Sequence, residues 1–115
     1  MMNPELKRSI QALKAASKKR DQAIWSKLAD ELDRSKRSRI AVNVSDINRH
    51  TQSGDTVAVP GKVLASGSLD HAVTVAAFGI SEGAKKKIAK AEGSAISLLD
   101  LLESGVEPSK IKIIK

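Results

Sequence analysis

The sequence contains no cysteine and almost no aromatic residues. Among its 115 residues there is one Trp, one Phe and no Tyr. Without cysteine, a disulfide framework, a thiolate metal site and a cysteine nucleophile are all excluded. Because aromatic rings are so few, Ala, Val, Ile and Leu must fill the core. For the same reason, recognition of single-stranded nucleic acid by base stacking is not favoured.

Long apolar runs are also missing. No segment approaches the roughly 20 apolar residues that cross a bilayer as a helix. The opening residues, MMNPELKRSI, lack the apolar stretch of a signal peptide. We therefore expect a soluble protein without a membrane partner.

Acidic residues are outnumbered by basic ones, 13 against 20, so the formal net charge is +7. The excess is uneven: residues 1–40 hold 11 Lys or Arg against 5 Asp or Glu, residues 41–79 hold 2 against 3, and residues 80–115 hold 7 against 5. A basic excess confined largely to one third of a small protein favours a polyanion partner, most commonly nucleic acid. The alternative is a surface kept soluble by its charge.

Residues typical of catalysis or metal binding are scarce. The two histidines, His50 and His71, have no nucleophile and orienting carboxylate near them in sequence. Asp70 and His71 are neighbours, but on a strand their side chains would point to opposite faces. The glycines between residues 60 and 68 do not have the spacing of a phosphate loop. The sequence therefore predicts no enzyme, no metal, no cofactor and no small-molecule substrate.

The chain length fits a single domain, residues 1–115, with a basic helical part at 1–39 and an α/β core at 40–115. Asn3 and Pro4 can begin a first helix of about three turns, followed by a turn in the charged segment 17–21. A second helix should run from Asp21 to near Asp33, with Trp25 as a buried anchor.

Short strands and helices alternate in the rest of the chain. Strands are predicted at 40–44, 56–59, 72–78 and 110–115, the last as an edge strand. Helices should begin after the capping residues Ser45, Ser81 and Ser97. Pro60 and Gly61 predict a type II turn with positive φ at the glycine. The predicted fold is α/β: an N-terminal helical pair packed on a small domain of alternating short strands and helices.

Three groups of basic residues are candidates for phosphate contacts. They are the junction of the first two helices (Lys18, Lys19, Arg20), the arginine-rich run at 34–39 (Arg34, Lys36, Arg37, Arg39) and a lysine face at 85–90 (Lys85, Lys86). Phosphate contacts position a protein without reading sequence, so folded RNA recognised by its shape is the expected partner.

Three segments resemble large-subunit ribosomal protein eighteen of the archaeal and eukaryotic type. They are SRIAVNVSDINRH (38–50), GDTVAVPGKVLASGSLDHAVTVAAF (54–78) and SEGAKKKIAKAEG (81–93). The resemblance implies a structural constituent of the large subunit of a cytoplasmic ribosome, bound to large-subunit ribosomal RNA beside neighbouring ribosomal proteins. It also implies a fold related to the bacterial-type ribosomal protein fifteen.

The resemblance also points to particular residues. The basic positions that match the family pattern are Arg37, Arg39, Arg49 and Lys62. The short chain favours the archaeal form. Members of this family usually end in a glycine-containing basic segment, whereas this chain ends VEPSKIKIIK, so no C-terminal RNA tail is expected. The alternative function is a free-standing chromatin or regulatory protein, which would bind duplex DNA as well.

Overall fold

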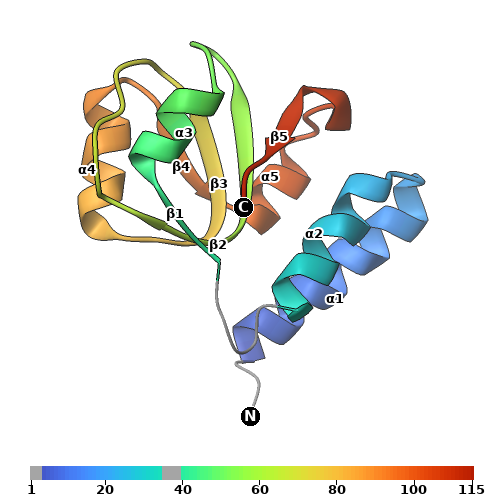
Figure 1. The fold of residues 1–115 in the computed structure, drawn as a ribbon. Helices are drawn as coiled ribbons and strands as arrows, with labels where there is room; N and C mark the ends of the chain where they lie inside the picture. Colours follow the sequence, from blue (N-terminus) through green and yellow to red (C-terminus); the bar gives the residue numbers. More distant parts are fainter. Residues whose placement is uncertain (1–3, 35–39) are drawn as a thin grey trace.

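A parallel β-sheet lies between two groups of helices (Figure 1). The structure, a computed structural model, describes residues 4–34 and 40–115, apart from the side chains of residues 5, 6 and 34. Its elements are α1 (Pro4–Arg20), α2 (Ala23–Arg34), β1 (Ala41–Asn43), α3 (Val44–His50), β2 (Thr56–Leu64), β3 (Thr74–Ile80), α4 (Glu82–Lys90), β4 (Ser94–Ser97), α5 (Leu98–Glu103), a 3-10 turn η1 (Pro108–Lys110) and β5 (Ile111–Ile113).

Strand β2 is the centre of the sheet. It pairs with β3, and β3 pairs in turn with β4 at one edge. Towards the other edge, β2 pairs with β5 along Thr56–Ala58 and with β1 along Lys62–Leu64. All these pairings are parallel, so the carboxyl ends of the strands lie at one end of the sheet.

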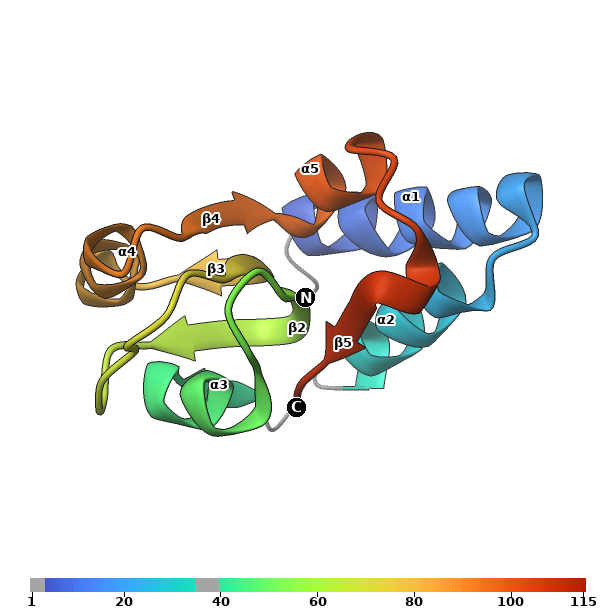
Figure 2. The same cartoon turned by 90° about the horizontal axis from the view of Figure 1, so that it is seen from above.

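The two faces of the sheet bury different side chains, because neighbouring residues of a strand point in opposite directions. Val57 and Val59 of β2 pack with α3 and α4, whereas Ala58 packs with α1, α2 and α5. Figure 2 shows α3 and α4 on one side of the strands and the other three helices on the opposite side. The predicted α/β fold is confirmed.

Trp25 occupies the place that the sequence predicts. Only 1% of its surface is exposed, among Leu13, Leu28 and other residues of the helical face. Its indole Nε1 donates a hydrogen bond to Gln22 Oε1 over 2.6 Å, so the one polar atom of the ring is satisfied.

Two helix boundaries differ from the prediction. Helix α1 continues through the charged segment to Arg20, because Ala16 extends its buried stripe and basic residues suit the last turn of a helix. Helix α3 begins after Asn43 and not after Ser45. The backbone N–H of Asn43 donates to Asp46 Oδ2 over 3.1 Å, which favours the earlier start.

The other two predicted caps are confirmed. Ser81 Oγ accepts from the N–H of Ala84 over 3.2 Å at the start of α4. At the start of α5, Ser97 and Asp100 form a reciprocal capping box. Strand β4, which ends at Ser97, was not predicted.

The predicted turn at Pro60 and Gly61 is wrong, because both residues lie inside β2. The pairing of β2 with β3 shifts register between Val59 and Lys62, which accommodates the proline. Glycine is needed at position 61 for a different reason: a Cβ atom there would lie 2.3 Å from the carbonyl oxygen of Ile40.

Candidate nucleic-acid interface

The C-terminal end of α1 presents Lys18 and Lys19 to solvent, as the sequence predicts. Arg20 has an additional role. Its guanidinium donates to the carbonyl oxygen of Leu102 over 2.8 Å and so ties α1 to the end of α5. Lys7 and Lys14 are also exposed and share a helical face with Lys18. Their spacing of seven and four residues is the signal that would have added them to the candidate site.

Lys62 lies near the carboxyl end of β2 and is exposed. Its backbone N–H donates to the carbonyl oxygen of Ile40 over 2.9 Å. Its side chain runs beside Gly79 of β3, where a Cβ atom would lie 3.9 Å from Lys62 Cγ. Ile40 directly follows the arginine-rich run in sequence. The side chain of Arg34, and all of Lys36, Arg37 and Arg39, lie outside the described residues.

The lysines of α4 divide into two kinds. Lys85 and Lys86 are exposed, and Lys85 Nζ lies 3.6 Å from Glu82 Oε1. Lys87, in contrast, donates to the carbonyl oxygens of Ala65, over 2.5 Å, and of Gly67. The predicted lysine face therefore loses Lys87, which holds the loop after β2 against the helix.

Arg49 lies on α3 with 69% of its side chain exposed. It forms an ion pair with Asp46 one turn earlier. The hydrogen bond from the Asn43 N–H, and then the bond from Arg49, lower the pKa of Asp46. Part of the arginine charge is thus balanced on its own helix.

These basic residues do not form one patch. The C-terminal end of α1 and helix α4 lie at opposite ends of the molecule in both views (Figures 1 and 2). Lys62 and Lys85 both border the carboxyl end of the sheet. Lys62 lies beside Gly79, and Gly79 and Lys85 line the same cavity.

Asp70 and His71 do interact, contrary to the prediction, because they lie in the loop before β3 and not in a strand. Asp70 Oδ1 is 2.9 Å from His71 Nδ1, and this bond lowers the pKa of Asp70. His71 Nε2 is 2.7 Å from Thr51 Oγ1. Thr51 is 9% exposed and donates its hydroxyl proton to the carbonyl oxygen of Ile47, so it is no accessible nucleophile. The three side chains join two loops.

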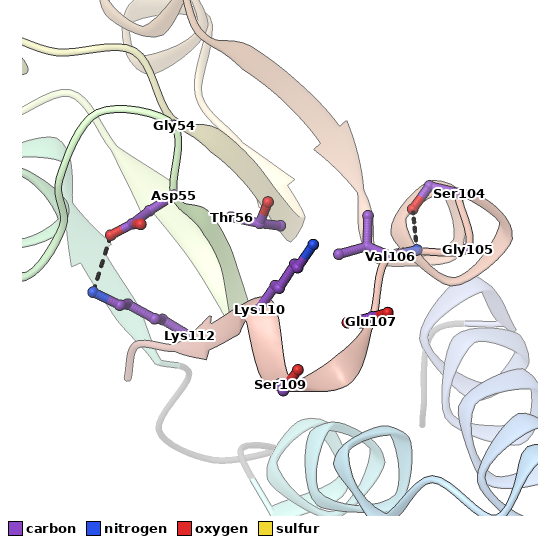
Figure 3. A pocket seen from close by; sticks show the side chains of 10 residues that line it. All are labelled: Gly54, Asp55, Thr56, Ser104, Gly105, Val106, Glu107, Ser109, Lys110 and Lys112. Atoms are coloured by element: carbon purple, nitrogen blue, oxygen red, sulfur yellow. Dashed lines mark hydrogen bonds and ion pairs between the residues drawn. The ribbon is translucent and has the colours of Figure 1, made fainter.

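A cavity of about 760 Å³ lies beside the amino ends of β2 and β5, at the end of the sheet away from Lys62 and Lys85 (Figure 3). Across it, Lys112 Nζ is 2.9 Å from Asp55 Oδ2, which also accepts from the N–H of Gln52 over 2.8 Å. The Gln52 bond and then the Lys112 bond lower the pKa of Asp55. Within residues 4–34 and 40–115, no cluster of His, Asp or Glu could hold a metal ion. The same residues include no helix long and apolar enough to cross a membrane.

Comparison with known proteins gives a family. Residues 9–96 match the model described as ribosomal proteins 50S-L15 and 50S-L18e together with their 60S counterpart. Relatives named large ribosomal subunit protein eL18 include those of Methanothermobacter thermautotrophicus (44% identical) and Methanospirillum hungatei (42%), each aligned over 98% of this chain and 93% of the relative. The Sulfolobus acidocaldarius protein of the same name is 42% identical over 82% of this chain and 80% of its own length. The chain therefore belongs to the ribosomal protein family of 50S-L15 and 50S-L18e.

Proposed function

We propose that this protein is a structural constituent of the large subunit of a cytoplasmic ribosome, where exposed Lys and Arg side chains bind the phosphates of large-subunit ribosomal RNA. The observation that carries the proposal is the match to archaeal eL18 proteins over nearly the whole chain. A structural role without catalysis agrees with the names of these relatives. Neighbouring proteins of the large subunit are the proposed protein partners.

Exposure and charge support a set of phosphate-binding residues. Within the described residues it comprises Lys7, Lys14, Lys18, Lys19, Arg20, Arg49, Lys62, Lys85 and Lys86. On the basis of charge alone, we add four residues of the arginine-rich run: Arg34, Lys36, Arg37 and Arg39. Because these contacts release counterions, affinity should fall steeply as salt rises, by roughly 0.9 log units per log unit of salt for each phosphate on duplex DNA and by a similar order here.

The test is a salt titration of binding to purified large-subunit ribosomal RNA. Changing Lys14 and Lys18 together to Gln should weaken binding and reduce the salt slope by about 2, one unit per phosphate contact. Lys27 and Lys110, which are exposed but outside the proposed set, changed to Gln, give a control with the same loss of charge. Equal effects of the two pairs would contradict the residue assignment, and a flat salt profile of the unaltered protein would contradict phosphate binding.

Duplex DNA as competitor separates this proposal from a free-standing chromatin or regulatory protein. A ribosomal constituent should prefer the ribosomal RNA at equal phosphate concentration. It should also sediment with the large subunit in a cell lysate. Equal affinity for duplex DNA, without sedimentation with the subunit, would favour the alternative.

A further inference from the structure

After the neighbouring strands β3 and β4, the chain turns towards opposite faces of the sheet. After β3 it enters α4, whose Ala84 and Ile88 pack against the face that carries Val75. After β4 it enters α5, whose Leu98 and Leu101 pack against the other face, with Ala76. In open parallel sheets, such a change of side opens a crevice at the carboxyl ends of the two strands, and ligands bind there preferentially.

A cavity of about 380 Å³ lies at this position. We call it the β3–β4 pocket; its lining includes Phe78, Gly79, Ile80, Lys85, Ile96 and Asp100. Phe78 is half-buried and packs on one side against the hydrophobic core between the sheet and the helical pair. Since Trp25 is fully buried, Phe78 offers the one phenyl or indole ring of the chain that a ligand can reach.

Positive charge borders the pocket. Lys85 lines it, and Lys62 runs beside Gly79, which also lines it. Lys62 has no ion pair or side-chain hydrogen bond within the described part of the chain, whereas Lys85 has only the 3.6 Å ion pair with Glu82. Two exposed lysines beside a hollow that holds an aromatic ring and aliphatic side chains suit a ligand with a flat apolar body and a flanking anion.

Asp100 adds a hydrogen-bond acceptor. Its Oδ2 accepts from the N–H of Ser97 over 3.4 Å, and Oδ1 makes no hydrogen bond within residues 4–34 and 40–115. A carboxylate oxygen can only accept, so it selects a ligand that presents N–H groups. Among the RNA bases, guanine presents a ring N–H and an amino group side by side on its Watson–Crick edge.

We propose that the β3–β4 pocket receives one unstacked base of RNA, preferably guanine, against the ring of Phe78. Its neighbouring phosphates lie at Lys62 and Lys85, and Asp100 accepts from its Watson–Crick edge. Sequence-specific recognition of RNA commonly uses such splayed bases, stacked on an aromatic ring and hydrogen-bonded on their edges. This inference rests on the proposed ribosomal RNA binding and adds one base-specific contact to phosphate contacts that read no sequence.

The experiment titrates the full chain with guanosine, adenosine and uridine monophosphate and with inorganic phosphate, followed by backbone amide NMR. Guanosine monophosphate should shift Phe78, Gly79, Ile96 and Asp100 at the lowest concentration. Phosphate alone should shift only residues near the lysines. Phe78→Leu, which keeps apolar bulk but removes the stacking face, should weaken guanosine monophosphate binding about tenfold, as expected for one lost stack.

Asp100→Asn gives a second, independent variant, because its amide oxygen can still accept from Ser97 N–H. It should reduce the preference for guanosine over adenosine monophosphate by roughly tenfold. Glu103→Gln, at the exposed far end of α5, removes the same charge away from the pocket and should leave the preference unchanged.

If inorganic phosphate and the nucleotides cause identical shifts, the pocket binds an anion alone and the proposed base contact is wrong. If nucleotides leave the pocket unaffected while large-subunit ribosomal RNA still binds, the pocket proposal fails and the ribosomal function stands. The pocket proposal also fails, and the ribosomal function stands, if the amide signals of the pocket shift only when other proteins of the large subunit are added. Failure of ribosomal RNA itself to bind would instead reject the proposed function.

Discussion

Gly61 illustrates how close contact between backbones restricts a single residue. A Cβ atom at this position would meet the carbonyl oxygen of Ile40 at 2.3 Å, and the backbone of β1 cannot move without breaking its pairing with β2. We expect Gly61→Ala to lower the free energy of unfolding by about 2 kcal/mol, within the usual range for overpacking. Gly79→Ala is the control, because its nearest contact would be an ordinary 3.9 Å. Urea unfolding of both variants tests this; equal stabilities would contradict it.

Lys87 is a lysine whose charge serves the fold. Its ammonium group donates to two carbonyl oxygens of the loop after β2, and hydrogen bonds from a charged donor are stronger than neutral ones. We expect Lys87→Met to lower the free energy of unfolding by about 1 to 2 kcal/mol, discounted for partial exposure. Lys86→Met on the same helix should change it little. A loss of RNA affinity without loss of stability would show that Lys87 contacts phosphate instead.

Asp55 should make the stability of the fold depend on pH in the acid range. Its pKa is lowered from an ordinary 3.8 by the Gln52 N–H and then by Lys112. A carboxyl group with a lowered folded-state pKa stabilises the fold above 3.8, and this stabilisation is lost as the pH falls through the folded-state pKa. Thermal melting from neutral pH to below 3.8 should therefore show a smaller decline for Asp55→Asn than for the unaltered protein. Asp30→Asn, on the outer side of α2, is the control; an unchanged decline in Asp55→Asn would contradict the assignment.

At the scale of elements, the sequence predicts what local signals determine. Ser81, Ser97 and Asp100 cap helices through contacts within four residues, so their pattern is legible in the chain. Strand β4 has only one β-branched residue and becomes a strand because β3 supplies its partner. The turn chemistry of Pro60 and Gly61 is overridden by pairing with residues some twenty positions earlier and later.

The candidate interface likewise contains residues that local sequence predicts and residues whose position depends on the tertiary fold. Exposure of Lys18, Lys85 and Arg49 follows from their place on the polar faces of helices. The position of Lys62 beside Gly79, and the pocket below Phe78, depend on which strands are neighbours. Lys87 lies on the polar face of α4, and only the path of the loop after β2 makes it structural.

Trp25 belongs to the hydrophobic cluster that joins the helical pair to the sheet. Truncating a buried Trp typically costs about 3 to 5 kcal/mol, a large part of the stability of a small domain. Trp25→Ala should therefore greatly lower the thermal midpoint. At a temperature where the variant remains folded, its affinity for ribosomal RNA should be unchanged. A folded variant that loses RNA binding would show that the ring is a contact residue.

At the scale of the molecule, the proposed phosphate contacts occupy distant surfaces. Lys18 and Lys19 lie in the last turn of α1, whereas α4, which carries Lys85 and Lys86, lies at the far end of the molecule (Figure 1). Sites so far apart, which share no interaction partner within the described residues, should contribute independently. Changing either pair to Gln should reduce the salt slope of RNA binding by about 2, and changing both by about 4. Salt titration of the three variants tests additivity; a combined effect no larger than one pair's would mean that the surfaces do not bind together.

The pairing of β2 with β5 has a consequence for folding during synthesis. Ile111–Ile113 complete the sheet beside Thr56–Ala58, and Lys115 Nζ reaches Glu31 Oε1 over 2.7 Å. A contact that joins residues so distant in sequence requires a large loop to close, which slows folding. While a ribosome still holds Ile111–Ile113, half of one side of the central strand is unpaired and open to other chains. Chaperone protection of the nascent chain would matter most in that interval.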